Sequence, residues 1–213
     1  MKMERIGRRN YVVTFALDAW DLNLHFITGE RYNYVIDTGL GSGSMAPILA
    51  WLQKSPKPVV VVNTHFHWDH IWGNHCFGSA LIVSHRLCRE IIAEKWDDML
   101  LKNRRYVRGT AEKALPNLVF EQALHFPDDG IQLLYTPGHT VDCISVYDER
   151  DKVLNAGDNI GDTLDELVPN IETDKAVFAQ TMRACQQLGV AACVSGHNVL
   201  LGPAVFGQIL DLL

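Results

Sequence analysis

Apolar and polar positions along the chain follow a pattern typical of short strands separated by polar loops. Residues 11–17, 22–28 and 32–37 are rich in β-branched and aromatic side chains, which favours strands. Val59–Val62 is four valines in succession, as expected for a strand buried on both faces. Further strands are predicted at residues 80–84, 118–120, 131–135, 143–147, 152–155 and 190–194.

Helices are predicted between these strands. Ser44 is a candidate N-cap for a helix with Pro47 in its first turns and an apolar face of Ile48, Leu49, Trp51 and Leu52. Two more helices are predicted at residues 86–101 and 175–188. Strands that alternate with helices indicate an α/β fold. Because no linker, repeat or low-complexity tract divides the chain, we expect one domain over residues 1–213.

Composition and charge narrow the possible partners. The chain has 213 residues, of which 47% are hydrophobic and 21% charged, as in ordinary globular proteins. A net charge of −6 gives little attraction for nucleic acid, so no nucleic-acid partner is expected; the expected partner, a small-molecule substrate, is inferred from the candidate site instead. No apolar run approaches the ~18–20 residues of a membrane span. The five cysteines are scattered without a C-x-x-C pair, which predicts reduced thiols and a cytoplasmic location.

One segment carries most of the chemical information. His65-x-His67-x-Asp69-His70 places four metal-binding side chains immediately beyond the valine strand. Chance would produce such a string in roughly one chain in a thousand of this composition. Imidazole and carboxylate groups are the ligands that zinc and iron accept in proteins. His65 and His67 can point to one side of an extended loop, which leaves Asp69 and His70 for a second ion.

Three later loops supply the remaining candidates, because two metal ions need about six or seven ligands with one of them shared. Each candidate follows a predicted strand: His139, Asp158 and His197. Loops that follow neighbouring strands can converge at one sheet edge, where a rigid scaffold holds their side chains. The other histidines lack this setting and are expected to be ordinary hydrogen-bonded residues: His25, His75, His85 and His125.

On these segments the chain resembles the metallo-β-lactamase-fold hydrolases, from residues 37–39 through 64–70 and 136–140 to 156–158 and 195–197. The resemblance implies a four-layered αβ/βα sandwich with metal ions at one edge between two sheets. It also implies a first metal bound by His65, His67 and His139, a second bound by Asp69, His70 and His197, and Asp158 as a bridge between them.

Departures from known branches of the family narrow the function. Zinc β-lactamases of the commonest kind have Cys where Asp158 stands, and the di-iron flavoproteins have Glu where His67 stands. Glyoxalase II carries a helical glutathione-binding domain, which the short stretch after His197 is not expected to provide. The nucleases of the fold carry inserted domains or exosites that this acidic chain is not expected to have.

We therefore predict a metal-dependent hydrolase with two metal ions, expected to be Zn²⁺. A bridging hydroxide would be the nucleophile, and Asp69 would orient it or accept its proton. The expected substrate is a small ester, lactone or thioester. Three alternatives remain open: a persulfide-dioxygenase-like oxidoreductase with one iron ion, a phosphodiesterase on the same site, and a binding module without catalysis.

Some residues allow two interpretations at this stage. Asp37 either accepts a hydrogen bond from a ligating histidine or stabilises the turn that follows it. Trp68 and Trp72 either line a substrate pocket or pack in the interior. The basic segment 102–108 either clamps an anionic substrate or is the solvated end of a helix. Cys143 is predicted to be a buried strand residue rather than a ligand or nucleophile.

Overall fold

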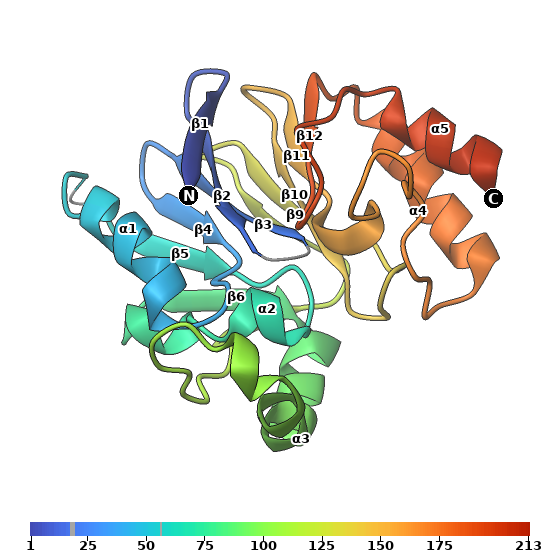
Figure 1. Ribbon diagram of the computed structural model, residues 1–213. Helices are drawn as coiled ribbons and strands as arrows, with labels where there is room; N and C mark the ends of the chain where they lie inside the picture. Colours follow the sequence, from blue (N-terminus) through green and yellow to red (C-terminus); the bar gives the residue numbers. More distant parts are fainter. Residues whose placement is uncertain (18–19, 56) are drawn as a thin grey trace.

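Two β-sheets form the centre of the molecule (Figure 1). The computed structural model describes residues 1–17, 20–55 and 57–213. The first sheet has the order β1 (Lys2–Ile6), β2 (Asn10–Ala16), β3 (Asp21–Thr28), β4 (Asn33–Ile36), β5 (Val59–Val62), β6 (Leu81–His85) and β7 (Leu118–Phe120). The second has the order β12 (Ala192–Val194), β11 (Val153–Asn155), β10 (Ile144–Asp148), β9 (Ile131–Tyr135) and β8 (Ala123–Phe126). Neighbours are parallel from β4 to β7 and between β11 and β12, and antiparallel elsewhere.

Helices cover the outer faces of the two sheets. The helices are α1 (Ser42–Leu52), α2 (Trp68–Ile71), α3 (Arg86–Asn103), α4 (Lys175–Gln187) and α5 (Val205–Leu212), with 3₁₀ turns η1 (Asn74–Phe77), η2 (Arg104–Tyr106) and η3 (Gly157–Asn159). In Figure 1, α1, α2 and α3 lie on the side of the first sheet, and α4 and α5 on the side of the second. The predicted α/β fold, a four-layered αβ/βα sandwich, is confirmed.

The interior between the sheets is apolar and continuous. It contains inward-facing side chains of both sheets, among them Ile36, Val60, Val62, Leu133, Ile144 and Val146. Val59, on the opposite face of β5, packs against the cluster beneath α1, so this strand is covered on both faces as its four valines predict. Burying one such aliphatic side chain stabilises a fold by about 1.5–3 kcal/mol. The strands that end at the site are therefore rigid supports.

Helix α1 begins earlier than its sequence suggests. Ser44 was predicted to cap it, but the helix starts at Ser42 with Gly41 at the N-cap position. Gly41 has a φ of 119°, a backbone conformation that glycine adopts readily, and this lets the helix begin three residues sooner. The hydroxyl of Ser44 instead accepts a hydrogen bond from the Leu40 amide at 3.2 Å. The prediction of Ser44 as the cap is therefore wrong.

Four loops that follow strands meet at one edge of the sandwich. One loop follows β5 of the first sheet, and the other three follow β9, β11 and β12 of the second sheet. The loop after β5 reaches the second sheet, since the Ile144 amide donates to the Thr64 carbonyl at 2.9 Å. The loop after β12 is tied to β3, since the Asn23 amide donates to the Gly196 carbonyl at 2.7 Å. Of the helices in the described ranges, none has both the length and the apolar character to span a membrane.

Candidate metal centre

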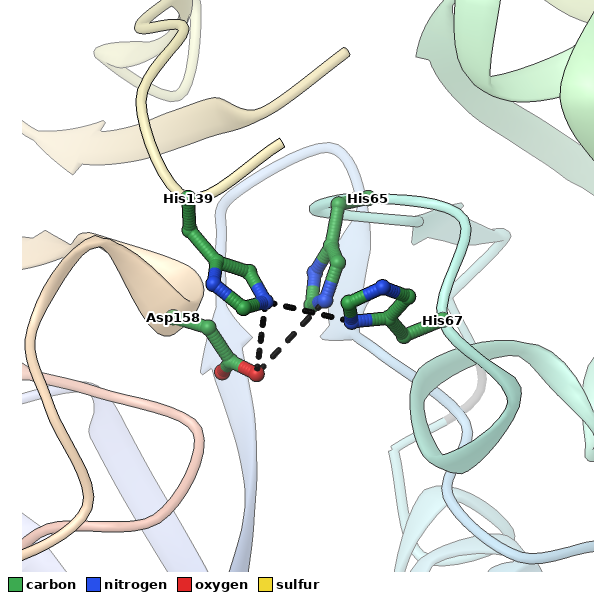
Figure 2. Close-up of side chains that lie close together, drawn as sticks. All are labelled: His65, His67, His139 and Asp158. Atoms are coloured by element: carbon green, nitrogen blue, oxygen red, sulfur yellow. Dashed lines mark hydrogen bonds and ion pairs between the residues drawn. The ribbon is translucent and has the colours of Figure 1, made fainter. Parts of the chain in front are cut away.

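All seven predicted metal ligands converge at this edge in two groups. In each group, one candidate ligand atom per residue lies within 4.8 Å of the others. The first group is His65, His67, His139 and Asp158, and the second group is Asp69, His70 and His197. The first group comes from the loops after β5, β9 and β11, and Figure 2 shows its four side chains pointing toward one another.

In the first group, nitrogen atoms face a carboxylate. Nδ1 of His67 and Nε2 of His139 are 3.1 Å apart. Oδ2 of Asp158 lies 3.5 Å from Nε2 of His65 and 3.9 Å from Nε2 of His139 (Figure 2). Three imidazole nitrogens and one carboxylate oxygen around a common point form a ligand set of the kind that zinc accepts.

The second group is built around Asp69. Its Oδ2 atom lies 3.4 Å from Nε2 of His70 and 3.3 Å from Nε2 of His197. Oδ2 of Asp158 lies 3.3 Å from the same two nitrogens, so this atom faces both groups. A carboxylate shared between two ligand sets is what a pair of neighbouring metal ions requires.

Hydrogen bonds fix the orientation of the imidazole rings. Nδ1 of His139 donates to the Asn170 carbonyl and Nδ1 of His197 to the Asp21 carbonyl, both at 2.8 Å. A ring whose Nδ1 carries the proton has a free electron pair on Nε2. These bonds therefore aim the Nε2 atoms of His139 and His197 at the centre.

Asp37 holds one histidine of each group. Nδ1 of His70 donates to Oδ2 of Asp37 at 2.8 Å. The Thr64 hydroxyl donates to the same oxygen at 2.7 Å and lies 3.1 Å from Nδ1 of His65, from which it accepts. Of the two interpretations of Asp37, the structure supports the one in which its carboxylate orients ligand histidines.

The first group is electrostatically prepared to present neutral imidazoles. Burial lowers the pKa of His65 well below its ordinary value, and the nearby His70 lowers it further. Burial, together with His139, lowers the pKa of His67 to about 4. Both rings are therefore unprotonated at neutral pH, which is the form that binds a metal ion.

In the second group, carboxylates determine the pKa values of the histidines. Burial alone would lower the pKa values of His70 and His197, but the charges of Asp158 and Asp69 raise both well above the ordinary value. In return, His70 and His197 hold the pKa values of both carboxyl groups well below their usual range, although burial opposes this. The field that favours a proton among these side chains favours a divalent cation in the same place.

Buried polar atoms without partners indicate where such a cation fits. Nε2 of His65, Nε2 of His70 and Oδ1 of Asp158 are buried and have no hydrogen-bond partner among the described residues. Leaving such groups unsatisfied is costly, and native proteins rarely do so without a ligand or bound water. The donor set, with its nitrogens and carboxylates, fits zinc or iron and so agrees with the chemistry expected at this edge.

Two residues that support the centre were not identified from the sequence. Gly196 packs so closely on the centre that a Cβ atom there would overlap Oδ1 of Asp158 and press on His70. The buried amide of Asn159 accepts from the His139 backbone at 2.9 Å and donates to the Thr136 carbonyl at 2.7 Å. Neither role has a sequence signal, because a glycine or asparagine in a loop ordinarily signifies only a turn.

The other residues singled out from the sequence lie at the site, in the interior or on the surface. Trp68 lines the cavity above the ligands, whereas Trp72 is fully buried and packs in the interior. Cys143 is 1% exposed, as predicted, and burial raises the pKa of its thiol. Arg104 and Arg105 form part of the exposed turn η2 after α3 and do not line this cavity, which favours the interpretation as a solvated helix end.

The other four histidines have ordinary hydrogen-bonding roles. His25 bonds with Asn10, and the side chain of His85 caps α3. His75 contacts the Trp72 carbonyl, and His125 lies 3.2 Å from Glu149. None of the four belongs to either ligand group.

Comparison with known proteins identifies relatives along most of the chain. An acyl-coenzyme A thioesterase of Gallus gallus is 24% identical over 203 residues, covering 84% of this chain and 73% of that protein. A hydroxyacylglutathione hydrolase of Mesorhizobium japonicum is 26% identical over 170 residues, covering 78% of this chain but only 59% of the relative. Both relatives are therefore longer than the part that this chain matches.

Solved structures and a family model agree on the fold. The structure of a metallo-beta-lactamase from Pontibacter korlensis superposes with a TM-score of 0.79 at 21% identity, covering 99% of this chain and 97% of that one. The family model of the metallo-beta-lactamase superfamily matches residues 18–197, which include all seven residues of the two ligand groups. The chain belongs to the metallo-beta-lactamase superfamily.

Proposed function

We propose that the protein is a hydrolase that holds two zinc ions and cleaves a small ester, lactone or thioester. The observation that carries this proposal is the position of Asp158. Its Oδ2 atom lies 3.5 Å from Nε2 of His65 in the first group and 3.3 Å from Nε2 of His70 in the second. One carboxylate oxygen shared by two complete ligand groups supports two ions rather than one.

The two ligand groups would hold one ion each, with Asp158 between them. When bound there, the ions supply an acidified water as the nucleophile and polarise the carbonyl oxygen under attack. Zinc suits the first group because it offers three imidazole nitrogens with a single carboxylate.

Asp69 is the residue best placed to handle a proton. Its carboxylate borders the cavity above the ligands and faces the second group, whose histidines hold its pKa well below the ordinary range. It is therefore a carboxylate at neutral pH, able to orient a water molecule or accept its proton. Because Asp69 is also a proposed ligand, its removal would impair both functions.

The size of the cavity and the relatives support an acyl substrate. A cavity of about 340 Å³ opens over the ligands, which is enough for a small molecule. The two relatives described above are named for the hydrolysis of acyl-coenzyme A and hydroxyacylglutathione. Both names thus describe the cleavage of an acyl bond.

The proposal is tested by removing and restoring metal. Chelation should abolish hydrolysis of a panel of esters, lactones and thioesters and lower the melting temperature, and zinc should restore both. A phosphodiester panel and oxygen uptake with glutathione persulfide, run on the same preparations, cover the alternatives. Full hydrolytic activity in metal-free protein, or oxygen consumption without hydrolysis, would overturn the proposal.

A further inference from the structure

The cleft over the metal centre has a rim that is acidic and apolar. The cavity of about 340 Å³ adjoins another of about 620 Å³. The two cavities share four lining residues, which are Trp20, Asp162, Glu166 and His197. They therefore form one cleft, with the metal ligands at one end and an open extension at the other.

A closed loop supplies the acidic side of this rim. The Gly161 amide donates to the Leu167 carbonyl at 2.8 Å, and the Glu166 amide to the Thr163 hydroxyl at 3.1 Å, which joins the ends of the loop. Between these ends the loop presents Asp162, Glu166 and Leu164, whose side chain is 62% exposed. No lysine or arginine occurs in the sequence between Lys152 and Lys175.

Aromatic side chains form the opposite side. The Trp20 ring lies 5.0 Å from the His197 ring and 6.0 Å from the Trp68 ring. Arg105 is stacked on Tyr106, with its guanidinium carbon 4.7 Å from the ring centroid, and is not part of the cleft lining. Among the described residues that line the cleft, none is lysine or arginine.

We infer that this cleft selects its substrate by charge and prefers acyl compounds whose leaving group is cationic or uncharged over those whose leaving group is anionic. The inference rests on the proposed hydrolase function and adds a substrate class to it. Carboxylates at the mouth of a cleft concentrate cations and repel anions, and aromatic rings that line a cleft favour the same sign of charge. In the extension, the apolar side chains of Leu164 and Val199 can contact an uncharged arm.

The inference separates this chain from the substrates in its relatives' names. Coenzyme A and glutathione both carry negative charge, and a cleft that holds them needs basic side chains to pair with it. Asp162 and Glu166 occupy the rim instead, and no described lysine or arginine forms an ion pair with either. Thioesters of small neutral or cationic thiols are therefore better candidates than thioesters of these cofactors.

The test uses thioesters that differ only in the leaving thiol. One acyl group is joined to thiocholine (cationic), to 3,3-dimethylbutanethiol (its uncharged isostere) or to 2-mercaptoethanesulfonate (anionic). We expect kcat/KM of the zinc-loaded protein to be roughly tenfold higher for the cation than for the anion at low salt. The ratio should shrink in high salt, because salt screens exposed charges.

Variants identify the source of the preference. Asp162→Asn combined with Glu166→Gln should bring the cation-to-anion ratio to within about twofold. Asp165→Asn is the matched control, because Asp165 is an exposed acid of the same loop that does not line the cleft. It should leave the ratio unchanged. Binding of the corresponding amides, which resist hydrolysis, is measured by calorimetry on the same proteins as a readout that does not depend on turnover.

The outcomes separate this inference from the proposed function. A ratio near one, a preference for the anion, or a ratio that the double variant leaves intact would overturn the inference even if hydrolysis is rapid. A rim-dependent preference in amide binding without hydrolysis of any thioester would support the charge selection and refute the proposed hydrolase.

Discussion

Nδ1 of His70 donates a 2.8 Å hydrogen bond to Oδ2 of Asp37, a carboxylate that also accepts from the Thr64 hydroxyl. Through Thr64 the same carboxylate reaches His65. One buried side chain therefore orients a histidine of each ligand group. The two groups are therefore linked through Asp37 as well as through Asp158, whose Oδ2 atom faces both groups.

Asp37→Asn should weaken metal binding at both groups, because an amide is a weaker acceptor and carries no charge. We expect zinc affinity to fall by about 10–100-fold at each, as found when the partners of ligating histidines are lost. Asparagine tolerates the positive φ of 62° at this position, so the fold should survive. The measurement is competition with a zinc chelator of known affinity.

Thr64→Val is the matched control for this prediction. It removes the link between Asp37 and His65 and leaves the bond to His70 in place. The loss of affinity should then be confined to the ion of the first group. Equal weakening of both ions by Thr64→Val, or no weakening by Asp37→Asn, would show that Asp37 does not orient the ligands.

Asp158→Ala tests the proposed bridge. The first group would keep His65, His67 and His139, whereas the second would lose the carboxylate that it shares, so the second ion should be lost preferentially. Activity should fall by about two or more orders of magnitude, and the pH profile of the activity that remains should shift to higher pH. Retention of both ions with an unchanged pH optimum would mean that Asp158 is not a bridge.

Replacement of Arg104 and Arg105 by alanine should leave KM unchanged for anionic and neutral substrates alike. Both side chains are exposed at the end of α3, outside the cleft lining. If they clamped an anionic substrate, its KM would rise more than kcat would fall, and the rise would diminish in high salt. Steady-state kinetics at two ionic strengths distinguish these results.

His25 should make the fold sensitive to acid. It is fully buried in β3, bonded to Asn10, and burial lowers its pKa to about 4. Since the unfolded chain binds this proton with a pKa of about 6.5, the contribution to stability is complete above that pH and is lost as the pH falls toward 4. At pH 5 we expect a cost of about 2 kcal/mol.

Urea unfolding at pH 7 and pH 5 measures this cost, in the presence of a chelator so that metal release does not contribute. His25→Gln should reduce the loss of stability between the two pH values. His125→Gln, at an exposed position, serves as the control and should not reduce it. Identical losses in the wild type and His25→Gln would contradict the assignment to His25.

The layered fold and the grouping of the ligands could be predicted because both depend on strong local patterns. Four consecutive valines specify β5, and the histidine segment follows directly where the strand ends. Of the two interpretations left open for Asp37, the hydrogen bond to His70 decides for the orienting role. The ligand roles of the seven residues, the cytoplasmic location and the identity of the metal remain predictions.

Elements that depend on their surroundings could not be predicted. β1 is mostly exposed and polar, and it is a strand because it pairs with β2. β8 is a short strand that pairs only with β9 along one edge of the second sheet. α5 has no capping side chain at its start, so the sequence carries no signal for its beginning, and its apolar face is held by packing against the second sheet and α4.

The metal content of protein purified without added metal tests the central claim most directly. The ions are counted by mass spectrometry against the chain concentration, with hydrolysis assayed on the same sample. We expect about two zinc ions per chain, since Asp158 joins two complete ligand groups. One iron ion per chain, or a hydrolytically active chain without metal, would contradict a dinuclear zinc hydrolase.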